Sequence, residues 1–404
     1  MRLPAKIKEI LHIFEKENID VYVVGGALRD ILLGRKPSDF DLATPAVPEK
    51  VQELFKSYRL VLTGVKHGTV GVLYKNIYVE ITTFRKEEDY IDHRHPTKID
   101  FIDDLKSDLS RRDFTINALA YNNQLYDYFG GINDLNNKII KTVGNPYQRF
   151  EEDGLRVLRA LRFSSMLDFP IDNETEKAIH EKKDLILSAS YERINAEFSK
   201  LLIGSGVDNV IKNYFSIIGV FIPRLIEIAF NDDMAEKIAR LVAKTEALLV
   251  PRLAALYYLL VQNDYDFVFE DLQRLKYSKK ISYQVKDILF ITSLLENIDD
   301  IKIKKILKAY DESAIITAVT IKETADNMDF SYLKERIHIN SSECYNLKKM
   351  HLKGDDLLTL GIKNKRNIKE ILEYLLNEII EGRLINDKDV LITKAKEIKR
   401  KKEN

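Results

Sequence analysis

Two aspartates, Asp39 and Asp41, are separated by a single aromatic residue in the N-terminal part of the sequence. Along an extended strand successive side chains point to opposite faces, so both carboxylates would lie on one face and Phe40 on the other. Carboxylate oxygens are the hard ligands that Mg²⁺ prefers, especially beside phosphate groups. We therefore expect Asp39 and Asp41 to bind magnesium if a phosphate-binding segment lies nearby.

Such a segment comes just before the aspartates. The apolar run Val21–Val24 ends in Gly25 and Gly26, and a helical pattern that contains Arg29 follows. Glycine lets the backbone approach a ligand closely, free N–H groups at a helix start favour an anion, and arginine donates to phosphate as a fork. The order of strand, glycine turn and helix thus predicts that Gly25, Gly26 and Arg29 bind the phosphates of a nucleotide.

Two further stretches are rich in arginine. In the first, RRDFTINALA, the guanidiniums of Arg111 and Arg112 could clamp a triphosphate, and the amide of Asn117 could bind the sugar or a phosphate. The second, residues 149–167, has apolar residues at near-helical spacing. We expect it to form one helix whose face carries an acid, Asp153, and a row of arginines that step by three, namely Arg156, Arg159 and Arg162.

The composition indicates what kind of protein must position these residues. With 404 residues the chain can form two to four domains, and its scarcity of glycine, proline and tryptophan favours helices. Lys+Arg and Asp+Glu both number 63, so nucleic acid would have to bind where charge is locally segregated. A single cysteine rules out an internal disulfide framework, and no signal peptide or long apolar run appears. We expect a cytoplasmic protein with no membrane segment.

The N-terminal third combines helices with alternating strands. Apolar spacing predicts a helix over residues 4–18, and alternation predicts strands over 60–62, 71–74 and 77–82. Glu80 lies on the last strand, where a third metal-site carboxylate and a solvent-facing glutamate are equally consistent with the pattern. The charged stretch 86–109 is expected to be mostly irregular. Its His93 and His95 superficially suggest a metal cluster, but a flexible loop fits better.

Three motifs together resemble the signatures of the class II tRNA nucleotidyltransferase and bacterial poly(A) polymerase family, within the DNA polymerase β superfamily. They are GGxxRD followed by DxD, the ungapped RRDFTxNA, and EDxxRxxRxxRF. The resemblance implies an α+β fold: a polymerase-β-like nucleotidyltransferase head with a small mixed or antiparallel sheet, followed by all-helical parts. We expect a catalytic head (1–138), a nucleotide-selecting neck (139–202), a body (203–300) and a tRNA-binding tail (301–404). Nearly all of the resemblance lies within residues 1–200.

The resemblance also implies an activity, which is the template-independent addition of CCA to tRNA 3′ ends from CTP and ATP, with Mg²⁺ and without an obligate protein partner. Rival activities are an A-adding enzyme, a poly(A) polymerase and, in a different class, an inactive RNA-binding protein. The residues expected to act are Asp39, Asp41 and Glu80 as catalytic carboxylates and Gly25, Gly26, Arg29, Arg112, Asn117, Asp153, Arg156, Arg159 and Arg162 as nucleotide-binding groups.

Within this set, Asp153 and Arg156 are expected to select the base. A carboxylate only accepts hydrogen bonds and a guanidinium only donates them. Cytosine and adenine both present an amine donor beside a ring-nitrogen acceptor, which the pair would match, whereas uracil and guanine would leave both groups mismatched. The ERIxxE-like segment from Glu192 to Glu197 resembles one that braces the neck. Residues 253–260 lack the His-Asp pair of a phosphohydrolase domain that several relatives carry.

Overall fold

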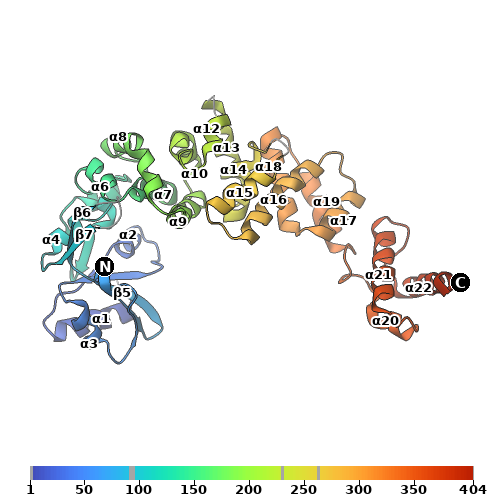
Figure 1. Ribbon diagram of the computed structural model, residues 1–404, viewed down its shortest axis with the longest axis horizontal. Helices are drawn as coiled ribbons and strands as arrows, with labels where there is room; N and C mark the ends of the chain where they lie inside the picture. The colour runs from blue at the N-terminus through green and yellow to red at the C-terminus, as the bar shows by residue number, and fades with distance from the viewer. Residues whose placement is uncertain (1–2, 91–95, 229–231, 262–263, 404) are drawn as a thin grey trace. The chain divides into compact units, whose positions relative to one another are not determined.

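The computed structural model describes residues 3–90, 96–228, 232–261 and 264–403 (Figure 1). Its contacts divide the chain into two compact units, Met1–Glu227 and Ile228–Asn404. The first unit contains a mixed sheet and the helices that follow it, and the second is helical. This confirms the predicted α+β head followed by helices. The four functional domains expected from the sequence are a finer division, which remains a prediction.

The first unit is built on a seven-stranded sheet in the order β3-β4-β5-β2-β1-β8-β9. Its β2 and β5 strands run parallel, and the other neighbouring strands are antiparallel. The parallel register sets Asp41 of β2 opposite Glu80 of β5. The strands are β1 (Tyr22–Val24), β2 (Phe40–Thr44), β3 (Arg59–Val61), β4 (Thr69–Tyr74), β5 (Ile77–Thr83), β8 (Leu119–Asn122) and β9 (Gln124–Asp127).

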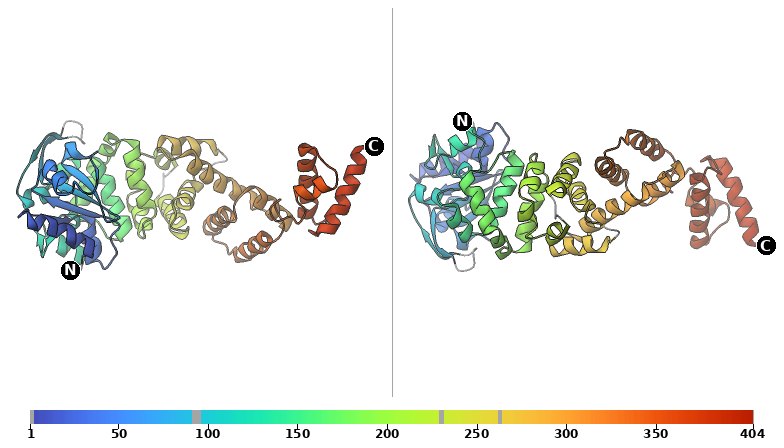
Figure 2. Two further views of the ribbon diagram at one scale, coloured as in Figure 1. Left: turned by 90° about the horizontal axis from the view of Figure 1, so that it is seen from below. Right: turned by 90° about the horizontal axis from the view of Figure 1, so that it is seen from above.

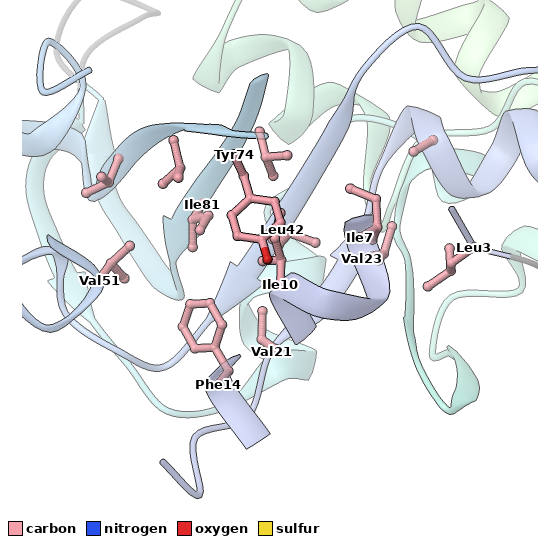
Figure 3. Close-up of a cluster of buried hydrophobic side chains, with 14 of the residues drawn as sticks. Leu3, Ile7, Ile10, Phe14, Val21, Val23, Leu42, Val51, Tyr74 and Ile81 are labelled. Carbon is pink, nitrogen blue, oxygen red and sulfur yellow. The ribbon is translucent and has the colours of Figure 1, made fainter. Parts of the chain in front are cut away.

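Three short helices accompany the sheet: α1 (Ala5–Lys16), α2 (Gly26–Leu32) and α3 (Pro48–Leu54). The expected spacing on α1 is confirmed, because Ile7, Ile10 and Phe14 are fully buried. Figure 3 shows these side chains gathered with Val23 and Leu42 of the sheet, in one apolar cluster. This core fixes β1 and β2, and therefore the ends of the strands that carry the predicted site.

The expectation that residues 86–109 are mostly irregular is wrong. Strands β6 (Arg85–Tyr90) and β7 (Pro96–Phe101) pair as an antiparallel hairpin, and α4 (Leu105–Ser110) follows. The sequences of the two strands, RKEEDY and PTKIDF, are mostly charged or polar, so they lack the apolar alternation by which a strand is recognised in a sequence. His93 and His95 lie outside the described residues, so the interpretation of that tip stays a prediction.

The single helix expected over residues 149–167 is also wrong, because two helices meet there: α6 (Pro146–Glu152) and α7 (Leu155–Leu167). Asp153 between them has an extended backbone (φ −145°, ψ 104°). At Gly154 a Cβ atom would lie 2.0 Å from the carbonyl oxygen of Leu185, so only glycine fits against that backbone. Asp153 and Arg156 therefore do not share a continuous helix face.

After the sheet the chain makes two isolated bridges, Phe114 to Thr142 and Ile140 to Ile171. The remaining helices of the first unit are α5 (Gly131–Asn136), α8 (Asn173–Lys182), α9 (Tyr191–Leu202), α10 (Val207–Asn213) and α11 (Phe215–Ile218), and α12 (Pro223–Ile228) ends at the unit boundary. In Figures 1 and 2 the green helices lie beside the blue and cyan strands.

The second unit contains ten helices within the part of it that the structure describes. Helices α20 to α22 enclose their own core around Leu357, Leu375 and Leu391. Among the described residues, none of the helices is both long and apolar enough to cross a membrane. The ten are α13 (Asp232–Lys244), α14 (Leu249–Tyr258), α15 (Asp266–Arg274), α16 (Lys279–Leu294), α17 (Asp300–Ala309), α18 (Glu312–Asp326), α19 (Ser331–Ser342), α20 (Gly354–Thr359), α21 (Lys365–Ile380) and α22 (Lys388–Glu403).

Candidate active site

A cleft of about 600 Å³ in the first unit is lined by every site residue that the sequence predicts. A hollow of about 680 Å³ beside α1 is slightly larger but contains none of them, so we assign the site by its chemistry rather than its size. The predicted residues in the cleft are Gly25, Gly26, Arg29, Asp39, Asp41, Glu80, Arg112, Asn117, Asp153, Arg156, Arg159 and Arg162.

The carboxylates lie where β2 begins and where β5 runs parallel to it. Asp39 directly precedes β2, and Asp41 is its second residue. The Asp41 carboxylate is open to the cleft but is largely surrounded by protein atoms. This burial, together with repulsion from Asp39 and Glu80, raises the pKa of Asp41 to about 6, and the charge of Arg112 opposes the shift. Glu80 accepts a hydrogen bond from the Tyr78 hydroxyl at 3.2 Å.

The donor set suits a divalent cation held by two carboxylates. A positive ion between Asp39 and Asp41 would relieve the repulsion that raises the pKa of Asp41. Within the described residues, no group of three or more His, Cys, Asp or Glu side chains is close enough together to hold a metal ion. The role of Glu80 as a third carboxylate of the site stays a prediction.

The glycine turn brings the backbone against the charged groups of the cleft. Gly25 precedes α2 with φ 73°, a left-handed conformation that favours glycine. A Cβ atom there would lie 3.3 Å from Nη1 of Arg112 and 3.6 Å from Oδ2 of Asp41. Gly25 thus allows a basic and an acidic group to converge on one point, and any larger residue would be strained.

Arg29 and Asn117 were predicted from separate motifs, and the structure joins them. Nη1 of Arg29 donates to Oδ1 of Asn117 at 2.9 Å, and its Nε and Nη2 donate to Oδ1 of Asp30 at 2.9 and 2.7 Å. Nδ2 of Asn117 in turn donates to Oδ1 of Asp113 at 3.3 Å. This chain of hydrogen bonds fixes the direction of the Arg29 guanidinium across the cleft.

A buried acid that the sequence interpretation missed holds the two consecutive arginines. Asp108 is fully buried on α4, and its carboxylate pairs with Nη2 of Arg111 at 2.8 Å and Nη2 of Arg112 at 3.4 Å. It also accepts from the backbone N–H of Arg85 at 3.3 Å, at the base of the β6–β7 hairpin. An acid three and four residues before two arginines on a helix was the available signal.

Asp113 likewise forms an ion pair with the row of arginines on α7. Burial alone would raise its pKa, but the charge and hydrogen bonds of Arg159 lower it to about 2. Nε of Arg159 donates to Oδ2 of Asp113 at 2.8 Å, and Nη1 donates to Oε1 of Glu197 at 3.2 Å. Nε of Arg162 lies 2.6 Å from Oε2 of Glu197. Burial lowers the pKa of Arg162 to about 10, with Glu197 opposing.

The two residues expected to select the base already have protein partners. Oδ2 of Asp153 accepts from Nη2 of Arg193 at 2.7 Å. Nη1 of Arg156 donates to Glu152 at 2.6 Å, and its Nη2 donates to the carbonyl of Arg111 at 3.0 Å. Arg193 and Glu197 both belong to the ERIxxE-like segment, so α9 contacts the row of charged residues as the sequence resemblance implies.

Three family models match the chain. They are a poly A polymerase head domain over residues 21–141, a probable RNA- and SrmB-binding site of polymerase A over 168–214, and a putative tRNA nucleotidyltransferase domain 2 over 253–395. The last match lies in a region where the sequence interpretation found only weak resemblance. The sequence there predicts helices but contains no contiguous motif, so its pattern alone does not identify the domain.

Individual relatives match almost the whole chain or about half of it. A CCA-adding enzyme of Ligilactobacillus salivarius is 35% identical over 411 residues, which cover 98% of each chain. One from Lactobacillus helveticus is 47% identical over 201 residues, 49% of this chain and 50% of its own.

Solved structures agree in fold over nearly the full length. The Bacillus stearothermophilus CCA-adding enzyme in complex with CTP has a TM-score of 0.75, 28% identity and 99% coverage of both chains. The Thermotoga maritima enzyme complexed with tRNA has a TM-score of 0.70 and 23% identity, covering 98% of this chain and 96% of its own, which shows a common fold. With its cleft, its fold and 35% identity to a relative along almost its entire length, this chain belongs to the family of CCA-adding enzymes and is an RNA nucleotidyltransferase.

Proposed function

We propose that the cleft adds C, C and A to the 3′ end of tRNA, without a template, from CTP and ATP. In each addition the 3′-hydroxyl of the RNA loses its proton and its oxygen bonds to the α-phosphorus of the nucleotide. The bond between that phosphorus and the oxygen bridging to the β-phosphate breaks, and pyrophosphate leaves. The observation that carries this proposal is the convergence of all predicted site residues in one cleft of a chain that matches a CCA-adding enzyme along its full length.

In this proposal Asp39 and Asp41 hold Mg²⁺, whose chemistry when bound is to lower the pKa of the attacking hydroxyl and to neutralise the triphosphate. The mutual repulsion of the two carboxylates supports this assignment. Gly25 leaves room for the phosphates, and Arg29 and Arg112 donate to them. Asp108 keeps Arg112 in place, because the two side chains form an ion pair inside the protein.

Asp153 and Arg156 read the Watson–Crick edge of the incoming base. Asp153 accepts from the exocyclic amine and Arg156 donates to the ring nitrogen, which admits cytosine and adenine alike. Each unpaired buried group left by uracil or guanine costs about 1–3 kcal/mol, so two mismatches discriminate by roughly 10²-fold or more. The CTP complex of the Bacillus stearothermophilus relative supports CTP as one substrate. These substrates also make a cytoplasmic location the natural one.

One assay tests the proposal. Purified protein is incubated with tRNA lacking CCA, with tRNA ending in CC, or with an unrelated oligonucleotide, and CTP and ATP are supplied separately and together. We expect two C and one A on the first substrate, one A on the second, and no extension of the third. Addition of A alone to CC ends would indicate an A-adding enzyme. Long A tails on the unrelated oligonucleotide would indicate a poly(A) polymerase, and no addition at all an RNA-binding protein.

A further inference from the structure

Phe163 lies at the end of the arginine row, and three guanidiniums converge on its ring. The guanidinium carbon of Arg162 lies 3.8 Å from the ring centroid, that of Arg29 5.2 Å and that of Arg159 5.6 Å. All three distances are within the range in which a cation is attracted to an aromatic face. Phe163 is 5% exposed and lines the cleft, so little water competes for these contacts.

The three arginines come from two different helices. Arg29 belongs to α2, which follows the glycine turn, whereas Arg159 and Arg162 belong to α7. Phe163 is therefore a contact shared by the nucleotide-binding turn and the helix that carries the arginine row. The ring of Phe114, next to Asp113, packs edge-on against Phe163 at 5.4 Å and 74°, which holds the Phe163 ring from another side.

Three like charges around one ring repel one another, and each guanidinium also has an acidic partner. Asp30, Asp113 and Glu197 pair with the three guanidiniums, yet burial still lowers the pKa of Arg162. A neutral side chain of the same size would offer the guanidiniums no attraction, whereas the negative face of a phenyl ring does. The aromatic ring thus adds an attraction to the ion pairs that keep the cations together before any anion arrives.

We propose that Phe163 is a positioning residue for nucleotide binding: its ring holds Arg29, Arg159 and Arg162 in one cluster by cation–π contacts. This inference rests on the proposed function, since the three arginines line the cleft assigned to the nucleotide. The effect falls on binding of the nucleotide rather than on the chemical step, because Phe163 acts through the arginines and does not touch the metal-site carboxylates.

The test changes the electrostatics of the ring while its shape stays nearly constant. Phe163 is replaced by 4-fluoro-, 3,5-difluoro- and 3,4,5-trifluorophenylalanine, which weakens the negative face step by step. The same series at Phe14 is the control, because that ring lies in the apolar core and packs at a tilt against the ring of Phe55. For each variant we would measure kcat and KM for CTP addition, Kd for CTP without RNA, and the melting temperature.

We expect KM and Kd to rise with each fluorine at position 163, by about 10-fold for the trifluoro ring, while kcat changes less than 2-fold. The Phe14 series should leave KM unchanged. Equal KM values across the series at position 163, in folded protein, would overturn the inference, as would a loss confined to kcat. Phe163→Leu, which removes the aromatic face altogether, should raise KM at least as far as the trifluoro ring. Failure of the unmodified protein to extend tRNA would instead contradict the proposed function.

Discussion

Arg193 of α9 donates to the carboxylate of Asp153 at 2.7 Å, across the break between α6 and α7. Asp153, the residue proposed to accept from the amine of the base, is thus already ion-paired with an arginine from a separate helix. On the other side of the break, Glu152 holds Arg156 at 2.6 Å. A base that enters must share these groups with partners that already orient them.

This arrangement determines how the selection of bases should be tested. Inverting the pair alone, Asp153→Arg with Arg156→Asp, would place like charges beside Arg193 and Glu152. We therefore expect a clean result in a background that carries Arg193→Gln and Glu152→Gln. There the inverted pair should shift incorporation from CTP and ATP towards UTP and GTP, because its donors and acceptors are exchanged. Each nucleotide is tested singly, with the Gln background as control, and an active inverted protein that still prefers CTP and ATP would show that another group reads the base.

Removing either metal-site carboxylate should abolish addition. We expect Asp39→Ala and Asp41→Ala to lower kcat by roughly 10³-fold or more, since the charge that holds the cation is lost. Binding of tRNA, measured by gel shift, should stay within about 2-fold, because phosphate contacts elsewhere supply the affinity for RNA. Glu49→Ala, at an exposed position on α3, is the control. Turnover retained in both aspartate variants would refute the metal assignment.

The β6–β7 hairpin should matter more for the final A than for the two Cs, as the family resemblance implies. The register allows a defined shortening: because Lys86 pairs with Asp100, residues 87–99 can be replaced by an Asn-Gly turn that keeps the first pairs. We expect the shortened protein to produce tRNA ending in CC, which sequencing of the RNA ends would reveal. Completion of CCA at an unchanged rate would mean that the hairpin has no part in switching the base.

Asp113 should make the fold sensitive to acid. Its pKa is about 2 in the folded protein, below the 3.8 of an unperturbed aspartate, because it is paired with Arg159. Its contribution of about 2 kcal/mol is therefore fully present above about pH 5 and is lost as the pH falls towards 2. Urea unfolding of the wild type and of Asp113→Asn should differ by this amount at pH 6 and converge near pH 2. A difference that is the same at both pH values would refute the assigned ion pair.

The sequence predicted the groups of the cleft better than the contacts among them. Asp39, Asp41 and Arg112 could be found because each stands in a contiguous motif with its own spacing. The pairing of Asp153 with Arg193 could not be found this way, since it joins positions 40 residues apart in the chain. The break at Gly154 escaped prediction because helical spacing of the apolar residues continues across it. The hairpin escaped because its strands are mostly charged or polar and lack apolar alternation.

Gly154 gives one substitution an effect out of proportion to its size. A single methyl group there would meet the carbonyl oxygen of Leu185 at 2.0 Å, so Gly154→Ala would act as a wedge between α7 and the segment Lys183–Ser188. Neither Gly154 nor Leu185 offers a polar side chain to the substrate. The accuracy with which bases are chosen would nevertheless depend on both, because the wedge would turn Asp153 away from Arg156. Fidelity in this protein is therefore partly a property of how closely two backbones approach each other.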